Sequence, residues 1–327
     1  MKLYRYLIIF VFYFTSSTPF FAQGTLPIYS DYLSDNVYLL HPAAAGIGNC
    51  GKARFTARQQ WAGIPNSPEL QTFSFHTKIG EESNTGLGFI VFNDQNGFHS
   101  QKGIQGTYAY HIPLSDGRVF KQLSFAISYS AVQNQSDQRG FIDPTIAQII
   151  ESSEYFNADF GMAYHLGGFS SYLTVKNLLI SARNSFRNRF EPLNLRNYIA
   201  SFGYYFGEDK YIQLEPSIML QFIERTGEKT ADFNLKAYKT FETTRIWAAI
   251  SYRRSFDGNT IQDLSSFTPI FGVNFNRFMF SYTYTKQLND ILLSNNGFHQ
   301  VSVGFDLLCR TPRAAACPNI NSAFNGF

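Results

Sequence analysis

The side chains best suited to chemistry in this sequence are six histidines and three cysteines, and their spacing builds no reactive motif. An HExxH motif and a Cys-x-x-Cys pair, the usual frameworks of a zinc site, are both absent. A GxSxG nucleophile turn and a Gly-rich phosphate loop with Lys-Ser or Lys-Thr are absent as well. We therefore expect no metal and no cofactor. The histidines are His41, His76, His99, His111, His165 and His299.

His165 gives the nearest approach to a catalytic arrangement, because Asp159 and Ser170 lie a few residues away. Separated strands can bring a Ser, a His and an Asp together. The plainer interpretation is a histidine that faces the interior or the rim of the fold. We prefer it because no further reactive groups converge there. The sequence therefore predicts a protein that is not an enzyme and has no catalytic residues.

The three cysteines are Cys50, Cys309 and Cys317. Cysteines of an exported protein can form disulfides, and an odd number leaves one over. Cys309 and Cys317 lie close together in the sequence and can close a short loop in the C-terminal tail. Alternatively, Cys50 pairs with Cys309, which requires that the first and last strands of a closed sheet are neighbours. We favour Cys309–Cys317 and keep the second pairing open.

Composition and charge exclude several classes of protein. The 327 residues include 27 basic and 24 acidic side chains, and a net charge of +3 disfavours a nucleic-acid binder. Aromatic residues reach 17%, which is too many for a disordered chain. The mean hydropathy of −0.17 disfavours a helical membrane protein, and no run of 18 apolar residues follows the N-terminus. A membrane location would therefore require a barrel.

The first 23 residues have the features of a secretory signal. Lys2 and Arg5 supply the positive start, and residues 7–14 supply an apolar run that is too short to span a bilayer as a helix. Small and polar residues then precede Ala22. We therefore expect the mature protein to be exported.

The elements that position the reactive residues are expected to be strands, because apolar and polar residues alternate in runs of about ten residues. In 277–286, for example, Phe278, Phe280 and Tyr282 share one face. The pattern predicts fourteen strands, and an even number is typical of bacterial outer-membrane barrels. The expected strands span 52–61, 70–79, 85–92, 101–112, 120–133, 155–166, 169–176, 195–206, 211–223, 230–238, 244–254, 265–273, 277–286 and 297–308.

The connections between these strands alternate in length, with the longer ones on average after the odd-numbered strands. This asymmetry predicts an all-β fold, a transmembrane antiparallel β-barrel with short periplasmic turns and longer extracellular loops. A soluble β-sandwich shares the strand periodicity but gives no reason for the alternation. The longest connections, 134–154 and 177–194, therefore offer the largest extracellular surface.

Five residues near these connections are candidates for partner binding. Arg183, Arg187 and Arg189 lie in the second long connection, and Arg196 follows it. They form either a basic docking surface or a solvated loop whose charges keep it out of the membrane. Trp61 ends the first expected strand. It is either an anchor for a partner or part of the aromatic belt at the membrane interface, and the belt is favoured.

A series of short motifs runs through the first third of the chain. They read Leu-Leu-His-Pro-Ala-Ala-Ala-Gly at 39–46, Arg-Gln-Gln-Trp-Ala-Gly at 58–63, Thr-Gly-Leu-Gly-Phe at 85–89 and Asn-Asp-Gln-Asn-Gly at 93–97. This order resembles the N-terminal signature of the PorP/SprF family, membrane components of the type IX secretion system. The likeness is good over 29–112 and looser beyond, up to a Cys-Pro tail. His41 departs from it, because the family usually has Asn before the proline.

The resemblance implies an outer-membrane barrel, surrounded by outer-membrane lipid, that works with the type IX secretion and gliding machinery. It implies docking or anchoring of secreted surface proteins, adhesins with a C-terminal sorting domain, and a link to periplasmic ring components. The alternative is a passive porin or small-solute transporter. A lumen filled by side chains or by a folded-in segment favours docking, whereas an open polar lumen favours transport. We expect a signal peptide at 1–23, a periplasmic segment at 24–51, the barrel at 52–308 and a periplasmic tail at 309–327.

Overall fold

The computed structural model describes most of the chain after residue 32. The expected signal at 1–23, Trp61, Arg183, Arg187 and Arg189 lie outside the described residues. Within the described part, no helix has the length and hydrophobicity needed to cross a membrane. The described residues are 33–60, 67–80, 83–115, 119–137, 139, 150–179, 196–208, 210–224, 226–256, 265–288, 297–312, 315, 317–318 and 320–321.

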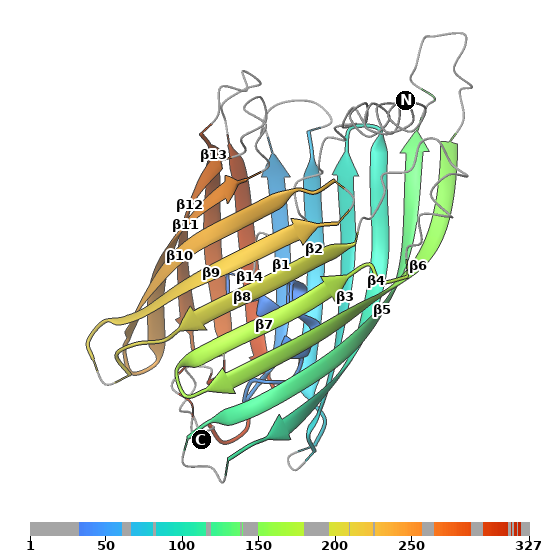
Figure 1. Cartoon of the computed structure of the whole chain (residues 1–327). Coiled ribbons are helices and arrows are strands. Elements are labelled where there is room, and N and C mark those ends of the chain that lie inside the picture. The colour runs from blue at the N-terminus through green and yellow to red at the C-terminus, as the bar shows by residue number, and fades with distance from the viewer. Residues whose placement is uncertain are drawn as a thin grey trace, which may run out of the picture.

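The described residues contain fourteen antiparallel strands that close into one barrel, which confirms the predicted fold class (Figure 1). Each strand pairs with its sequence neighbours, and β1 also pairs with β14. The strands are β1 Gly51–Gln60, β2 Glu69–Lys78, β3 Thr85–Asn96, β4 His99–Pro113, β5 Lys121–Asp137, β6 Ile150–Leu166, β7 Phe169–Lys176, β8 Asn197–Tyr204, β9 Gln213–Ile223, β10 Lys229–Thr240, β11 Thr244–Ser255, β12 Ser265–Phe275, β13 Phe278–Gln287 and β14 Phe298–Leu307.

The two faces of the wall have opposite character, as β4 illustrates. Ile104, Tyr108 and Tyr110 point outward and are about half exposed, whereas Gln105 and Thr107 point inward and are buried. A soluble protein buries its apolar face, but a barrel in lipid turns that face to the acyl chains and keeps polar groups for its interior. Closure between β1 and β14 leaves no strand edge with unpaired backbone groups, which lipid would penalise.

The connections follow the expected asymmetry with one correction. The sequence predicted that strands 85–92 and 101–112 are well separated, but β3 and β4 stay paired as far as Asn96 and His99. Only Gly97 and Phe98 join them, and Gly97 has the left-handed φ of 62° that favours glycine. The longest connections are 138–149 and 177–196, and both leave the same end of the barrel. By the rule for outer-membrane barrels this end is extracellular.

Residues 33–50 correct the expected domain layout, because they lie inside the barrel and not in a separate periplasmic segment. They form two short 3₁₀ helices, η2 (Val37–Leu39) and η3 (Pro42–Ala44). Helix η3 packs against β4, β5 and β6, and nearly every residue of the segment is buried. In Figure 1 these helices lie within the ring of strands, toward the end that carries the C-terminus. We call residues 33–50 the lumen segment.

The disulfide corrects a second expectation. Cys50 is bonded to Cys309, and Cys317 is buried outside the disulfide, so the favoured pairing of Cys309 with Cys317 is wrong. The physical reason is the closure of the barrel, since Cys50 directly precedes β1 and Cys309 follows its partner β14. The described part of the tail also folds back. Ile320 is buried, and its carbonyl accepts a hydrogen bond from the Asn49 amide at 2.9 Å.

Candidate functional site: a lumen closed by the N-terminal segment

Four buried charges attach the lumen segment to the seam of the barrel. Alternation along β1 turns Lys52 and Arg54 inward, and β14 contributes Asp306. The Asp35 carboxylate lies 3.2 Å from Lys52 Nζ and 3.1 Å from Arg54 Nη2. The same Arg54 nitrogen lies 2.8 Å from Asp306 Oδ1. Asp35 therefore bridges the lumen segment to two cations on the wall.

The Asp35 carboxyl stays ionised in this site. Burial raises its pKa, but the charges of Lys52, Arg54 and Lys236 lower it by more, so the pKa lies well below its usual range. Breaking such a pair leaves an uncompensated buried charge, which typically costs about 3–5 kcal/mol. The charge pairs therefore fix where the segment sits, whatever their net contribution to stability.

Hydrogen bonds hold the segment against β2 and β4, the strands on either side of β3. Asn36 Nδ2 donates to Ser74 Oγ on β2 at 3.0 Å, and Tyr38 OH donates to Thr107 Oγ1 on β4 at 2.8 Å. Both contacts join residues that lie far apart in the sequence, so they fix the segment against this part of the wall.

Lysines from the far wall bind backbone carbonyls of the segment. Lys236 Nζ on β10 donates to the Leu33 carbonyl at 3.1 Å, and Lys176 Nζ on β7 donates to the Leu39 carbonyl at 3.2 Å. Short irregular segments leave carbonyl groups without helix or sheet partners, and buried carbonyls need a donor. The two lysines satisfy this need without requiring a particular side chain in the segment.

His41 lies at the centre of the lumen segment and is fully buried. Its Nδ1 is hydrogen-bonded to Thr174 Oγ1 and its Nε2 to Ser201 Oγ, each at 2.8 Å. Its ring stacks on Tyr172 with centroids 5.0 Å apart. Burial, followed by the nearby charge of Lys176, lowers the pKa of His41 to about 3, so the imidazole is neutral. Both ring nitrogens are thus used to position the segment.

The Gly-Leu-Gly motif of β3 makes room for the segment. A Cβ atom on Gly86 would lie 2.1 Å from the Ala45 carbonyl oxygen, and one on Gly88 would lie 2.6 Å from the ring of Tyr38. Both are backbone or ring contacts that no real Cβ makes. The motif therefore serves close approach of the segment to the wall, as glycine in a strand often does.

The candidate residues named from sequence have other roles in the structure. Among the described ones, Arg196 contacts Glu224 at 3.2 Å and donates to the Leu178 carbonyl, at the rim with the long loops. His165 Nε2 is hydrogen-bonded to Tyr172 OH, and Asp159 accepts hydrogen bonds from other groups, the Gln105 side chain and the Asn177 amide. In the described part of the chain, no three His, Cys, Asp or Glu side chains are grouped to hold a metal ion.

Sequence reasoning missed the residues that close the lumen. Lys52, Arg54, Lys176 and Lys236 all sit at inward positions of expected strands, which is a readable signal for charges that need a buried partner. That signal does not name the partner. Asp35 lies in a stretch without periodicity, so nothing in its surroundings indicated that it meets β1.

Comparison with known proteins identifies the family. The sequence model of the type IX secretion system membrane protein PorP/SprF family matches residues 21–305. The fold is similar to Omp33 of Acinetobacter baumannii, with 6% identity, a TM-score of 0.44, and coverage of 80% of this chain and 100% of that one. It is also similar to BamA from Haemophilus ducreyi lacking POTRA domains 1–3, with 10% identity, a TM-score of 0.42, and coverage of 79% and 70%. No curated protein matches at a significant level.

The family match covers both the lumen segment and nearly the whole barrel. A closed barrel with an apolar exterior in a type IX secretion membrane protein is located in the outer membrane. The chain belongs to the PorP/SprF family of type IX secretion system membrane proteins.

Proposed function

We propose that this protein is a non-enzymatic docking or anchoring component of the type IX machinery. Its clients are secreted surface proteins, adhesins with a C-terminal sorting domain, and it links them to periplasmic components of the system. The observation that carries the proposal is the filled lumen. A segment of the chain crosses the interior that a porin leaves to water, which supports a barrel that presents surfaces over one that offers a passage.

The contacts of the lumen segment favour docking over passive transport. Charges and hydrogen bonds reach the segment from β1, β2, β4, β7, β8 and β10. Porins with an aqueous channel have more strands, whereas eight-stranded barrels are filled by side chains. A fourteen-stranded barrel lies between these limits, and here the lumen segment crosses the interior.

The two ends of the barrel offer different surfaces to partners. The extracellular end carries the long connections, with Arg183, Arg187 and Arg189 in the second one and Arg196 at its foot. We assign the basic connection to an acidic segment of the secreted client. The opposite end carries the Cys50–Cys309 disulfide and the tail, and we assign it to the periplasmic components.

Affinity purification of the tagged protein from its own outer membrane, in mild detergent, tests the proposal. Mass spectrometry should find large surface proteins with a C-terminal sorting domain, or periplasmic ring lipoproteins. The triple charge reversal Arg183→Glu, Arg187→Glu and Arg189→Glu should lower recovery of the surface protein. Arg139→Glu, an exposed reversal in the other long connection, is the matched control. A barrel that purifies without partners and conducts steadily in a planar bilayer would overturn docking in favour of a porin.

A further inference from the structure

The outer wall carries two hollows near its extracellular end, and their chemistry differs. The first lies over β1–β6 and has a volume of about 710 Å³. The second lies over β7–β11 and has a volume of about 580 Å³. Both open on the surface that faces lipid, so neither belongs to the lumen site.

The strand register explains the second hollow, which we call the alanine groove. Leu173, Ala200, Leu220 and Ala231 are direct neighbours across β7, β8, β9 and β10, and all four lie at outward positions. Small and large side chains therefore alternate in one row. The two alanines form the floor of the groove, and the two leucines rise beside them on the neighbouring strands.

A second row, closer to the extracellular end, borders the alanine groove. It contains Val175, Tyr198, Phe222 and Lys229, again as neighbours on consecutive strands. The Tyr198 and Phe222 rings stack with centroids 6.1 Å apart. Phe256 continues the row, because its amide donates to the Lys229 carbonyl. The groove thus has aliphatic and aromatic walls.

Two cations stand at the edge of this apolar groove. Lys229 lines it directly, and Arg254 is the cross-strand neighbour of Ala231, with its guanidinium 5.7 Å from the Phe256 ring centroid. Two carboxylates lie at the same rim: Glu224 accepts a hydrogen bond from Tyr198 and pairs with Arg196, and Glu228 directly precedes Lys229. They stand against three cations, Lys229, Arg254 and Arg196. The local balance beside the groove is therefore positive.

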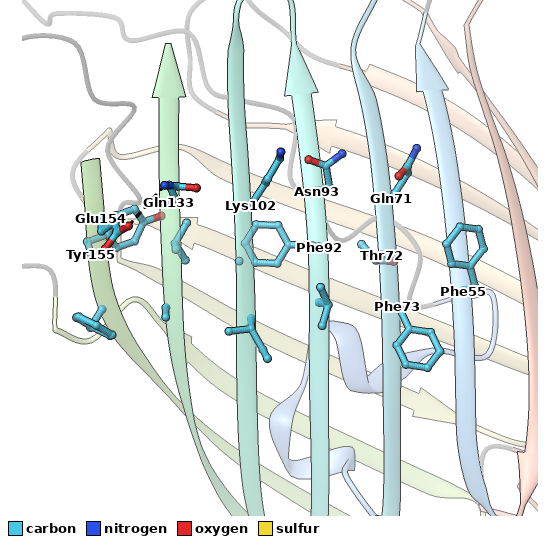
Figure 2. A pocket seen from close by; sticks show the side chains of 16 residues that line it. Phe55, Gln71, Thr72, Phe73, Phe92, Asn93, Lys102, Gln133, Glu154 and Tyr155 are labelled. Carbon is cyan, nitrogen blue, oxygen red and sulfur yellow. Dashed lines mark hydrogen bonds between the residues drawn. The ribbon is translucent and has the colours of Figure 1, made fainter. Parts of the chain in front are cut away.

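The first hollow lacks this excess of positive charge. Figure 2 shows a row of polar side chains above its apolar residues Phe55 and Phe73. This row contains a single cation, a single carboxylate and three amides, and Gln133 Nε2 lies 3.5 Å from Glu154 Oε1. The first hollow is thus a matched neutral counterpart on the same wall. The polar row is Gln71, Asn93, Lys102, Gln133 and Glu154.

We propose that the alanine groove binds one acyl chain of a phosphorylated lipid of the outer leaflet, with its phosphate between Lys229 and Arg254. The groove opens on the lipid-facing wall at the extracellular end, so an acyl chain is the apolar group available to it. The cations complement a phosphate, and guanidinium is the side chain best matched to phosphate geometry. This inference rests on the outer-membrane location and is independent of the docking role.

Native mass spectrometry of the full-length barrel, delipidated by detergent exchange, tests the proposal. Titration with lipid A should show one lipid held more tightly than the rest, and phosphatidylglycerol serves as the comparison from the other leaflet. Lys229→Gln and Arg254→Gln should each weaken that site roughly tenfold, the loss expected for a charged hydrogen bond. Ala231→Phe fills the groove and should abolish it. Lys102→Gln and Ala131→Phe, in the first hollow, should leave it unchanged.

Three results would overturn the proposal. Equal lipid A binding by all variants would mean bulk annular lipid only. Equal affinity for phosphatidylglycerol would remove the outer-leaflet assignment. A protein that copurifies with the wild type and is lost only in Ala231→Phe would make the groove a protein interface. The two charge variants lie on exposed side chains, so they keep the test decisive if Ala231→Phe does not fold, which heat-modifiability on a gel would show.

Discussion

At the end of the barrel that carries the Cys50–Cys309 disulfide, wall charges pair with the lumen segment in addition to the Arg54–Asp306 pair within the wall. Toward the long loops, the pair formed by Arg253 lies within the wall. Asp35 takes Lys52 and Arg54 as partners at the first end. Near the second, Arg253 forms a double contact with Asp232 on the neighbouring strand, at 2.7 and 2.8 Å. The first arrangement needs the segment to be complete, and the second does not.

This difference shows that the charge pairs at one end of the barrel depend on the lumen segment, whereas the pair at the other end does not. A buried charge in the wall must find a partner, because an unpaired charge in the interior is costly. Where the partner lies in a separate segment, the charge pair fixes the position of that segment in the lumen. Where the partner lies on the next strand, the charge pair fixes only the register of the two strands.

The largest effect is expected from removing the charge of Asp35. Asp35→Asn removes the carboxylate shared by Lys52 and Arg54, while Arg54 keeps Asp306, at a cost of about 3–5 kcal/mol for the docked segment. Since every 1.4 kcal/mol is a factor of ten, openings of the lumen should become at least about a hundredfold more frequent. Single-channel recording in planar bilayers measures them.

Asp232→Asn is the matched control, because it makes the same chemical change in a pair within the wall. It should destabilise the barrel without opening the lumen. Equal conductance of the two variants would contradict the idea that Asp35, unlike Asp232, holds the lumen segment in place. A silent Asp35→Asn would mean that hydrogen bonds alone hold the segment.

The strands were predictable from sequence because their signal is local. Period-two alternation is written into each strand, and the tight β3–β4 turn has Gly97 at its first central position, where type II′ hairpins take glycine. Closure of the barrel was expected because a membrane protein without apolar helices must span the bilayer as a barrel. The error at this turn arose because the outward polar residues Asn93 and Gln95 lengthen β3 beyond its apolar run.

The lumen segment was not predictable, because its position depends on contacts between residues far apart in sequence. His41 meets Thr174 and Ser201, and no periodicity links them. The glycines of the 85–89 motif allow a close approach, but nothing in the motif says which segment approaches. The disulfide stayed open for a related reason, since Cys309 has one partner close in sequence and another close only after the barrel closes.

A smaller effect is expected from adding a side chain under the lumen segment. Gly88→Val places its Cβ against the Tyr38 ring and should disturb the Tyr38–Thr107 hydrogen bond. Overpacking of this kind costs about 1–3 kcal/mol. Gly106→Val on the adjacent strand is the control, because its Cβ meets nothing within 4 Å. Thermal unfolding, followed by heat-modifiability on a gel, should show a lower unfolding temperature for Gly88→Val than for Gly106→Val.

Tyr38→Ala in the Gly88→Val background sharpens this test. The double variant should recover part of the loss, since residues in contact give non-additive effects. If Gly88→Val and Gly106→Val lower the unfolding temperature equally, the Gly-Leu-Gly motif does not serve the segment.

The smallest effect is expected from mild acidification, one pH unit below 6.5, through His41. Its pKa in the folded protein, about 3, lies below the unfolded value of 6.5. The stabilisation is therefore fully present above pH 6.5 and is lost as the pH falls from 6.5 toward 3. One proton changes the free energy by about 1.4 kcal/mol for each pH unit in that window. Lys176 adds to the effect, because its charge also opposes protonation of the ring.

His41→Asn isolates this contribution, because Asn keeps a donor and an acceptor for Thr174 and Ser201 but does not titrate. Protease cleavage within residues 33–50, followed between pH 7 and pH 5, should rise in the wild type and rise less in the variant. The difference between the two curves removes other groups that titrate in the same window. Curves that coincide would mean that the protonation state of His41 does not affect how firmly the lumen segment is docked. Among the two titrating side chains Asp35 and His41, the docking would then depend on Asp35 alone.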